Sequence, residues 1–371
     1  MRVALAVRRL SPRGGLESNV LALARFLAGR GHAVTVVCQR VEPGGEVDAA
    51  IVRVGVPGVL GNTARTAFFA RRAGAALRRL DVDASFTSSH VAGPTVVRLE
   101  SGLVADHREA MRRRAPWGRR LRVTLDPSER AGELVERQKI AAARLVLTLS
   151  DAAAASVRAR HRVEPARIRV VRNGVDLARF VPPTGAERDD ARARYGVEGF
   201  VLAFVGSGFA RKGLGPLIDA LGRPEAPRGT TLLVAGRDGR AGAYRRRARR
   251  AAVDLRLLGF LPDVRPVLAA ADALALPSLY DPFGLSVLEA LATGLPAVVG
   301  SGAGASEIVP YPELVAGDPL DPALLARALG AARERAADPA TRCSARRAAE
   351  AHPIEASFLA IEGALLEAAR A

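Results

Sequence analysis

Short apolar runs alternate with helix-like patterns along most of this chain, and this alternation constrains its fold more than any other feature. In the first half the runs cover residues 3–7, 33–38, 50–56, 84–89, 95–100, 144–150 and 167–172. Several are apolar at consecutive positions, which indicates parallel strands covered by helices on both faces. Residues 16–29 repeat apolar side chains at helical spacing and end at a glycine, as an intervening helix would.

The alternation stops once, at the segment NGVDLARFVPPTG (173–185), and then resumes. A turn followed by a Pro-Pro pair is typical of a connection between domains. We therefore predict two domains, residues 1–178 and 179–371. The last helix, residues 353–370, is amphipathic and is a candidate to pack back on the first domain. The strands of the second domain are expected at residues 200–206, 230–236, 255–260, 273–277 and 296–301.

The predicted fold class is α/β, with two Rossmann-like domains whose parallel sheets face an interdomain cleft. A length of 371 residues fits two such domains. In sheets of this kind ligands bind at the carboxyl ends of the strands, where the strand order reverses. The only two cysteines, Cys38 and Cys343, exclude a disulfide framework and a zinc site made of four thiolates. No apolar stretch has the length of a signal peptide core or a membrane span, so we expect a cytoplasmic protein.

Charge is the second strong feature of the composition. The chain carries 55 Lys and Arg against 38 Asp and Glu, a net charge of +17. Nucleic acid, an anionic membrane surface or a phosphate-bearing substrate would each match this charge. Residues 237–250 hold one arginine-rich cluster, and residues 108–122 hold another, with seven arginines around Trp117.

The run at 108–122 is typical of a segment that lies at a membrane interface. Arg112, Arg113 and Arg114 would face anionic headgroups, and Trp117 would face the acyl boundary. A solvated loop is the alternative. No helix-turn-helix, RNP or zinc pattern accompanies either cluster, so nucleic acid is not an expected partner. We expect a peripheral protein on the inner face of the cytoplasmic membrane.

A glycine-rich turn follows the first strand of each domain. In the first turn, SPRGGLE (11–17), Gly15 lets the backbone approach a ligand, and the next helix offers amides to an anion. The second turn, GSGFARKG (206–213), begins at Gly206 and places Arg211 and Lys212 where a strand meets a helix N-terminus. Two cations beside free amides suit a diphosphate leaving group, whose charge grows as its bond breaks. An ordinary turn and a solvated basic pair are the alternatives.

The segment DPFGLSVLE (281–289) carries two carboxylates eight residues apart. We expect Asp281 to cap a helix that has Pro282 at its first position, which would set Glu289 about 12 Å along the axis. That span matches the distance from a nucleotide's ribose to the sugar beyond its diphosphate. Glu289 would accept from ribose hydroxyls and Asp281 from sugar hydroxyls, although a cap and a surface carboxylate are the simpler alternative. Three backbone amides would hold the same sugar, those of Phe283, Gly284 and Leu285.

Four segments of the chain resemble glycosyltransferase family 4, the retaining GT-B enzymes. They are the stretch AADALALPSLYDPFGLSVLEALATGLPAVV (270–299), the G-S-G-x-x-R-K-G turn, N-G-V-D at the boundary and the opening G-G-L-E. The resemblance covers nearly the whole chain in the right order. Within the family, the opening and the basic turn are most similar to lipopolysaccharide core glucosyltransferases. The resemblance implies retaining transfer of a hexose, glucose from UDP-glucose first of all, to a hydroxyl of a glycan or glycolipid. The lipopolysaccharide core is the first acceptor to consider, and no metal or other cofactor is expected.

The resemblance also implies roles for individual residues. Arg211 and Lys212 would bind the diphosphate, and Glu289 would hold the ribose. The family's acidic pair, normally two glutamates, falls on Asp281 and Glu289, so the first member is one methylene shorter here. Further positions carried over to the nucleotide-sugar site are Gly15, Asn19 and Arg179.

The family places an acidic residue or a histidine after a strand of the first domain, beside the reacting sugar. ESGLVADH (100–107) offers Glu100 or Ser101 by register, and His107 beyond them. We favour Glu100 and then His107 as the catalytic group, although a strand-end glutamate that pairs with an arginine is an equal alternative. The D-x-D at 81–83 lies where turn formers are common, and the two cations of the basic turn make a metal unnecessary.

Two other functions remain open from the sequence. A nucleotide-sugar epimerase would have the same architecture but would need basic groups for proton removal. A non-catalytic adaptor for nucleic acid or membrane would depend on the arginine runs alone.

Overall fold

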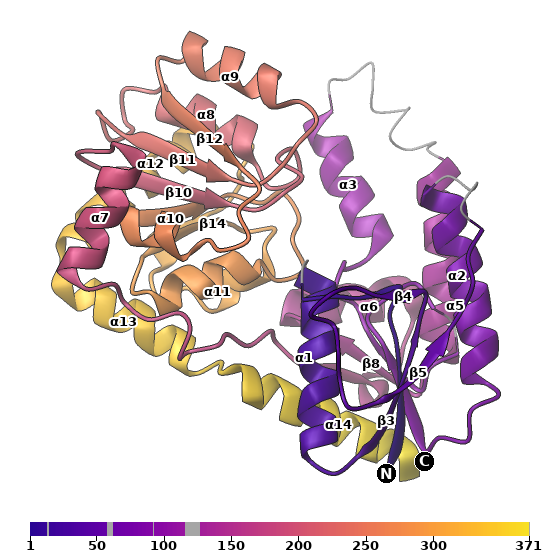
Figure 1. Cartoon of the computed structure of the whole chain (residues 1–371). Coiled ribbons are helices and arrows are strands. Elements are labelled where there is room, and N and C mark those ends of the chain that lie inside the picture. Colours follow the sequence, from indigo (N-terminus) through magenta and orange to yellow (C-terminus); the bar gives the residue numbers. More distant parts are fainter. Residues whose placement is uncertain (13–14, 58–61, 92, 116–126, 371) are drawn as a thin grey trace. The chain divides into compact units, whose positions relative to one another are not determined.

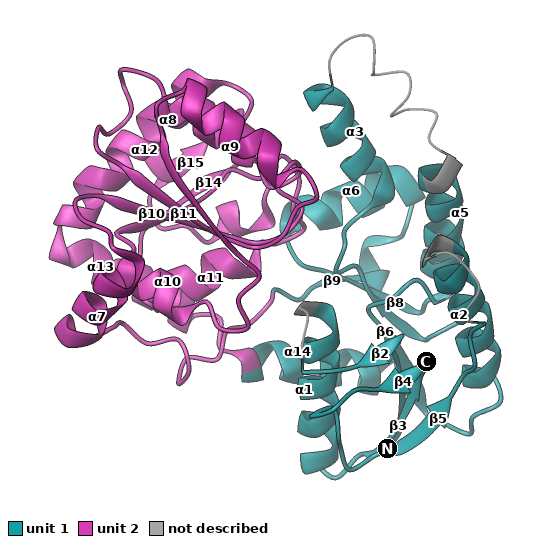
Figure 2. Cartoon of the chain, turned by 45° about the horizontal axis from the view of Figure 1, so that its top comes forward, with its two compact units in different colours: residues 1–172, 355–371 teal, residues 173–354 magenta. Residues whose placement is uncertain are grey.

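The computed structural model describes residues 1–12, 15–57, 62–91, 93–115 and 127–370 (Figure 1). Unit 1 consists of residues 1–172 and 355–371, and unit 2 consists of residues 173–354 (Figure 2). The division therefore follows Arg172 instead of residue 178. The reason lies in contacts that tie residues 173–178 to unit 2, because Ile354 N donates to Val175 O at 3.0 Å and the Arg346 guanidinium donates to Leu177 O at 3.3 Å.

Unit 1 is built on a parallel sheet of seven strands in the order β5-β3-β1-β6-β7-β8-β9. Its strands are β1 (Arg2–Ala6), β3 (Ala33–Cys38), β5 (Ala50–Arg53), β6 (Ala84–Thr87), β7 (Val96–Arg98), β8 (Leu145–Thr148) and β9 (Ile168–Val170). Its helices are α1 (Gly15–Gly29), α2 (Asn62–Leu77), α3 (Val104–Arg114), α5 (Pro127–Ala142), α6 (Asp151–His161) and α14 (Ile354–Arg370), with a short 3₁₀ turn at Pro165–Arg167. Two very short strands, β2 (Arg9–Leu10) and β4 (Arg40–Val41), pair beside the main sheet.

The register of unit 1 follows from burial of strand side chains on both faces of the sheet. Val3 of β1 lies opposite Val34 of β3 and Ala84 of β6, and every residue of β6 and β8 is buried. The helix α14 packs on α1, where the rings of Phe26 and Phe358 lie 5.4 Å apart. Apolar side chains on both faces explain why these strands have no polar alternation.

Unit 2 is built on a parallel sheet of six strands in the order β12-β11-β10-β13-β14-β15. Its strands are β10 (Val201–Val205), β11 (Thr231–Ala235), β12 (Asp254–Gly259), β13 (Ala273–Leu276), β14 (Ala297–Gly300) and β15 (Val315–Ala316). Its helices are α7 (Gly185–Tyr195), α8 (Leu214–Leu221), α9 (Ala241–Arg250), α10 (Arg265–Ala270), α11 (Leu285–Ala292), α12 (Pro322–Ala337) and α13 (Pro339–Glu350). Two 3₁₀ turns lie at Gly304–Glu307 and Pro312–Leu314.

Several helix ends of unit 2 are set by local sequence. Asp321 accepts from Ala323 N at 2.8 Å with proline next to it at the first helical position of α12. Thr184 and Glu187 form a reciprocal capping box at the start of α7, and Gly196 ends that helix with φ of +57°. These caps fix where each helix begins and ends, and so fix the turns that border the sheet.

The predicted fold class is confirmed, since each unit has a parallel sheet with helices between its strands. All twelve predicted strands are present within a few residues of their expected bounds. The strands β2, β4 and β15 were not predicted, because two residues are too short to show a periodicity. In the described part of the chain, no helix combines the length and apolar character that crossing a bilayer requires.

Candidate functional site

The carboxyl edge of the unit 2 sheet brings together two turns that are far apart in sequence. The strand β10 lies between β11 and β13, so the strand order reverses beside it, which is where doubly wound sheets bind ligands. The turn 206–213 follows β10 and the segment 277–284 follows β13. Ser286 at the start of α11 donates its hydroxyl to Val205 O at 3.0 Å, which fixes α11 to the end of β10.

Glycine is required at both ends of the basic turn, defined here as residues 206–213. Gly206 has φ of +147°, and a Cβ there would lie 2.6 Å from Lys212 Cδ, so the lysine side chain lies directly against its backbone. Gly213 has φ of +80°, and a Cβ there would lie 2.0 Å from Pro277 O. Leu279 N also donates to Arg211 O at 2.9 Å. The two turns therefore hold each other. The basic turn itself lies between β10 and the N-terminus of α8, as the sequence predicted.

The cations of the basic turn both contact one carboxylate. Lys212 Nζ lies 3.0 Å and Arg211 Nη1 3.4 Å from Asp281 Oδ2, and Arg211 also donates to Tyr280 O at 2.8 Å. Burial alone would raise the pKa of Asp281, but the charges of Lys212 and Arg211 outweigh it and hold that pKa below its ordinary value. The cluster has two positive charges against one negative charge, so it retains a net attraction for an anion.

The prediction that Asp281 caps α11 is wrong. The helix begins at Leu285, and its N-cap is Gly284, which has φ of +96° and ψ of 63° in the left-handed region. Asp281 instead lies in a short bridge with Ala303, in which Gly304 N donates to Asp281 O at 2.9 Å. Only Glu289 lies on the helix, so the two carboxylates are not separated by a helical span.

The backbone between the two carboxylates is tightly held. Phe283 is buried, its N–H donates to the Asp281 carboxylate, and its carbonyl accepts from Ala305 N at 2.6 Å. The amide of Phe283 is therefore already used within the protein. The remaining predicted amides, at the N-terminus of α11, belong to Gly284 and Leu285.

Glu289 is a half-buried carboxylate with no hydrogen bond or ion pair to any other residue that the structure describes. Burial raises the pKa of Glu289 to about 7, although the charges of Arg179 and Lys212 act in the opposite direction. Arg179 Nη2 lies 3.8 Å from Asp263 Oδ1. The structure thus places three predicted residues, Glu289, Arg179 and Lys212, within electrostatic reach of one another.

In unit 1, two predicted residues meet at a third that the sequence analysis did not select. Asn19 of α1 donates to Glu100 Oε1 at 3.3 Å, and Arg98 Nη1 lies 2.9 Å from the same oxygen. Arg98 is only 1% exposed and also donates to Val171 O at 3.1 Å. Glu100 therefore pairs with an arginine, as the alternative reading held. The signal for Arg98 was an arginine inside the apolar strand TVVRLE (95–100).

The other unit 1 candidates lie on helices. His107 is on α3, where its Nδ1 lies 3.5 Å from Glu129 Oε1 of α5. Gly15 is the first residue of α1. Arg112 pairs with Glu109 at 2.9 Å in the last turn of α3, which also carries Arg113 and Arg114. Trp117 lies outside the described residues.

Buried charges in unit 1 were also missed. Lys139 of α5 is 4% exposed, and burial lowers its pKa to about 8. On the same helix, Glu136 accepts from Val104 N at 3.0 Å and lies 3.3 Å from His161 Nε2. Burial and the charge of Lys139 lower the pKa of His90. The sequence offered one indication of these buried charges, namely that Lys139 is one of only two lysines in the chain.

The D-x-D carboxylates hold the first strand. Asp83 accepts from Arg2 N at 2.7 Å, and both Asp81 and Asp83 pair with the Arg2 guanidinium. Among the described residues, no three His, Cys, Asp or Glu side chains are grouped closely enough to hold a metal ion.

Comparisons with known proteins cover both units. Residues 13–179 match the family model Glycosyltransferase Family 4, and residues 199–334 match the model Glycosyl transferases group 1. A probable transglycosylase from Burkholderia thailandensis is 30% identical over 85% of this chain and 82% of its own length. A D-inositol 3-phosphate glycosyltransferase from Jonesia denitrificans is 31% identical over 50% of this chain, and the chain spans only 47% of that relative.

Solved structures share the fold at lower identity. WaaG, a glycosyltransferase involved in lipopolysaccharide biosynthesis, superposes with a TM-score of 0.78 at 22% identity and covers 98% of this chain and 99% of its own. HepE from Anabaena, solved in complex with UDP-glucose, superposes with a TM-score of 0.73 at 17% identity and covers 99% of this chain and 100% of its own.

Proposed function

The chain belongs to the family 4, or group 1, glycosyltransferases, and from this premise we propose that it is a retaining hexosyltransferase that uses a nucleoside diphosphate sugar. Its two parallel α/β units are those of the GT-B fold. The observation that carries the proposal is the cluster at the carboxyl edge of unit 2, where Arg211 and Lys212 share one carboxylate beside Glu289, which has no partner in the described part of the chain.

The donor diphosphate would bind at the basic turn. Two cations against Asp281 leave one positive charge uncompensated, and a diphosphate brings the charge that balances it. As the sugar–phosphate bond breaks, charge builds on the leaving group, and fixed cations stabilise that state more than the bound donor. Lys212 is largely buried, with 12% of its side chain exposed, which strengthens its interaction with that charge.

Glu289 would bind the ribose of the donor. Its carboxylate has no partner among the described residues, and a ribose offers two adjacent hydroxyl donors. Arg179 and Gly206 complete the proposed donor site. Arg179 places its charge near Glu289, and the backbone of Gly206 lies directly against the Lys212 side chain. UDP-glucose is the first donor to test, because HepE was solved with it.

In the proposed reaction the acceptor hydroxyl attacks the anomeric carbon on the face from which the diphosphate leaves. The departing phosphate oxygen takes the hydroxyl proton. Attack and departure on the same face retain the configuration, and the two cations of the basic turn take the place of a metal. Glu100, which Arg98 and Asn19 hold in place, is the unit 1 group that we assign beside the reacting sugar. The acceptor is a hydroxyl of a glycan or glycolipid, with the lipopolysaccharide core first because WaaG acts in lipopolysaccharide biosynthesis.

A lipid-borne acceptor would require the enzyme to work at the inner face of the cytoplasmic membrane. The last turn of α3 carries Arg112, Arg113 and Arg114, which would face anionic headgroups. Changing all three to Ser should weaken sedimentation of the protein with anionic vesicles. Unaltered sedimentation would remove this segment from the docking surface.

Incubation of the full chain with nucleotide sugars tests the proposal. We expect release of UDP from UDP-glucose that depends on an added acceptor, with deacylated lipopolysaccharide core, inositol phosphate and maltooligosaccharides as the acceptor panel. Inositol phosphate and maltooligosaccharides are included because relatives are named D-inositol 3-phosphate glycosyltransferase and glycogen synthase. Formation of an epimeric nucleotide sugar without acceptor would indicate an epimerase instead. No turnover with any nucleotide sugar would indicate a non-catalytic role.

A further inference from the structure

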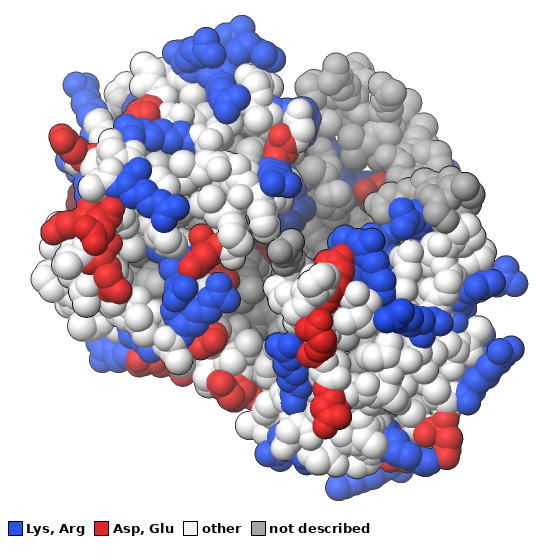
Figure 3. Space-filling model, viewed as in Figure 1, with Lys and Arg blue, Asp and Glu red and all other residues white. Residues whose placement is uncertain are grey.

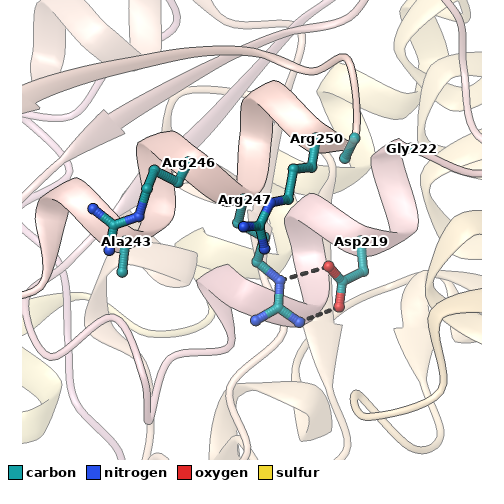
Figure 4. A pocket seen from close by; sticks show the side chains of 7 residues that line it. Asp219, Gly222, Ala243, Arg246, Arg247 and Arg250 are labelled. Atoms are coloured by element: carbon teal, nitrogen blue, oxygen red, sulfur yellow. Dashed lines mark hydrogen bonds and ion pairs between the residues drawn. The ribbon is translucent and has the colours of Figure 1, made fainter.

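The helix α9 of unit 2 is firmly seated by one face. Tyr244 and Ala248 are buried, and the Tyr244 ring meets the Phe209 ring edge-on at 5.5 Å. Arg247 donates from Nε to Asp219 Oδ1 of α8 at 2.5 Å and from Nη2 to the other carboxylate oxygen (Figure 4). This two-point ion pair and the buried ring fix which side of α9 faces solvent.

The solvent side of α9 presents four exposed arginines besides the paired Arg247. They are Arg245, Arg246, Arg249 and Arg250, and we name the last three, which are spaced i, i+3 and i+4, the α9 arginine face. All three are exposed, and none has a hydrogen bond or ion pair to any residue that the structure describes. Residues three and four positions apart share one side of a helix, so these charges lie close together. In the space-filling view, blue side chains gather over α9 at the top of the picture (Figure 3).

The α9 arginine face borders a pocket between α8 and α9. The pocket has a volume of about 600 Å³, and Arg246 and Arg250 line it together with the Arg247–Asp219 pair (Figure 4). Asp219 is neutralised by Arg247, so it does not offset the other two charges. Like charges at this spacing repel one another and destabilise a helix. A bound anion would remove that penalty.

The chemistry of the exposed side chains identifies the kind of partner. Apart from arginine, the exposed residues of α9 are Gly242 and Ala243. No aromatic or amide side chain is exposed there to stack on bases or to read them, and no large apolar side chain is exposed to fill a protein interface. Guanidinium groups bind phosphate in a two-point geometry. A surface that offers only closely spaced charge matches an array of phosphate headgroups.

We propose that the α9 arginine face docks unit 2 on an anionic phospholipid surface. This inference is independent of the glycosyl transfer proposed above and concerns a surface distinct from the last turn of α3. There Arg112 already pairs with Glu109, whereas the three α9 charges have no such partner among the described residues. Attraction of this kind is electrostatic, so salt weakens it.

The test is sedimentation of the full chain with vesicles of three parts phosphatidylcholine to one part phosphatidylglycerol, at about 0.1 M salt. We expect R246Q/R249Q/R250Q to lower the partition coefficient by about 100-fold, since each cation near such a surface contributes roughly a factor of five. The matched control is R228Q/R327Q/R347Q, which removes three exposed arginines elsewhere in unit 2. The control removes the same total charge, but it should keep most of its binding, because its three arginines lie outside the α9 arginine face.

Three outcomes would overturn the inference. Equal losses in the α9 variant and the control would show that net charge alone drives binding. Unchanged binding of the α9 variant would show that the face does not dock. Binding to a duplex RNA that the α9 substitutions abolish, with no binding to the vesicles, would assign the face to nucleic acid. Acceptor-dependent UDP release in solution should stay unchanged in the α9 variant, so failure here and failure of the proposed function are distinguishable.

Discussion

The two units place charged side chains at the same edge of their sheets, but they differ in how far those charges are satisfied. In unit 1, Glu100 is paired with the buried Arg98 and accepts from Asn19. In unit 2, two cations share Asp281, and Glu289 has no partner among the described residues. A satisfied pair positions a group, whereas uncompensated charge needs a ligand to balance it. The difference supports the proposal that the charged part of the substrate binds to unit 2.

Removal of Lys212 should have the largest effect on activity. Lys212→Ala is expected to lower turnover at least about 100-fold, on the scale of losing one donor to a developing oxyanion. Acceptor-dependent UDP release measures it, with Lys212→Arg as the variant that keeps the charge and restores part of the rate. Near-normal kinetics of the alanine variant would remove Lys212 from the mechanism.

Removal of the Glu289 carboxylate should weaken binding of the nucleotide-sugar donor. Glu289→Ala is expected to lower kcat/KM about 10- to 100-fold, mainly through KM, because a charged hydrogen bond to a ligand contributes about 1.5–3 kcal/mol. Glu334→Ala, on α12 of the same unit, is the control, because Glu334 is exposed and makes no ion pair with the described residues. Equal kinetics of the two variants would place the ribose elsewhere.

The same carboxylate should also make stability depend on pH. The pKa of Glu289 is about 7 in the folded chain, and the ordinary value is about 4.3. Between these values the unfolded chain has lost the proton that the folded chain keeps, so the free energy of unfolding falls as pH rises through this window. Glu289→Gln, which never ionises, should be more stable than the native chain above pH 7.

The expected gain in the free energy of unfolding of Glu289→Gln is about 1–2 kcal/mol, because partial solvent exposure screens the cost of burying the ionised carboxylate. The gain should vanish near pH 4. Denaturant unfolding at several pH values measures it. A variant that is less stable than the native chain at pH 8 would show that the Glu289 carboxylate has a stabilising partner.

His107 should have the smallest effect. Its contact is with Glu129 on the neighbouring helix, and both side chains are partly exposed. His107→Ala is therefore expected to change turnover by less than about threefold and the free energy of unfolding by less than about 1 kcal/mol. A tenfold loss of turnover in a normally folded variant would move His107 into the catalytic site.

The strands could be predicted from the sequence because a buried strand is apolar at consecutive positions, which a short stretch of sequence shows. The run FVLAFVG (200–206) is apolar at almost every position, and its strand β10 is buried throughout. The basic turn could be predicted for the same reason, since a strand, a glycine and a helix follow one another along the chain. The strand β15 could not be predicted, because only its neighbour β14 makes its two residues a strand.

The electrostatic partners at the unit 2 site could not be predicted, because they lie far apart in sequence. Asp281 has the sequence of a helix cap, with proline after it, yet its partners are Lys212 and Arg211, about 70 residues earlier in the chain. Gly284 can begin α11 in a left-handed conformation, which removes the need for an aspartate there. Arg98 was missed because the sequence of an apolar strand does not show that its arginine is buried or that Glu100 is its partner.

Calorimetric titration with UDP is the sharpest test of donor binding at the unit 2 site, because it requires no knowledge of the acceptor or the sugar. We expect UDP to bind the full chain and its affinity to fall at least about tenfold in both Lys212→Ala and Glu289→Ala, with Glu334→Ala unchanged. UDP binding of equal strength in all four proteins would contradict it.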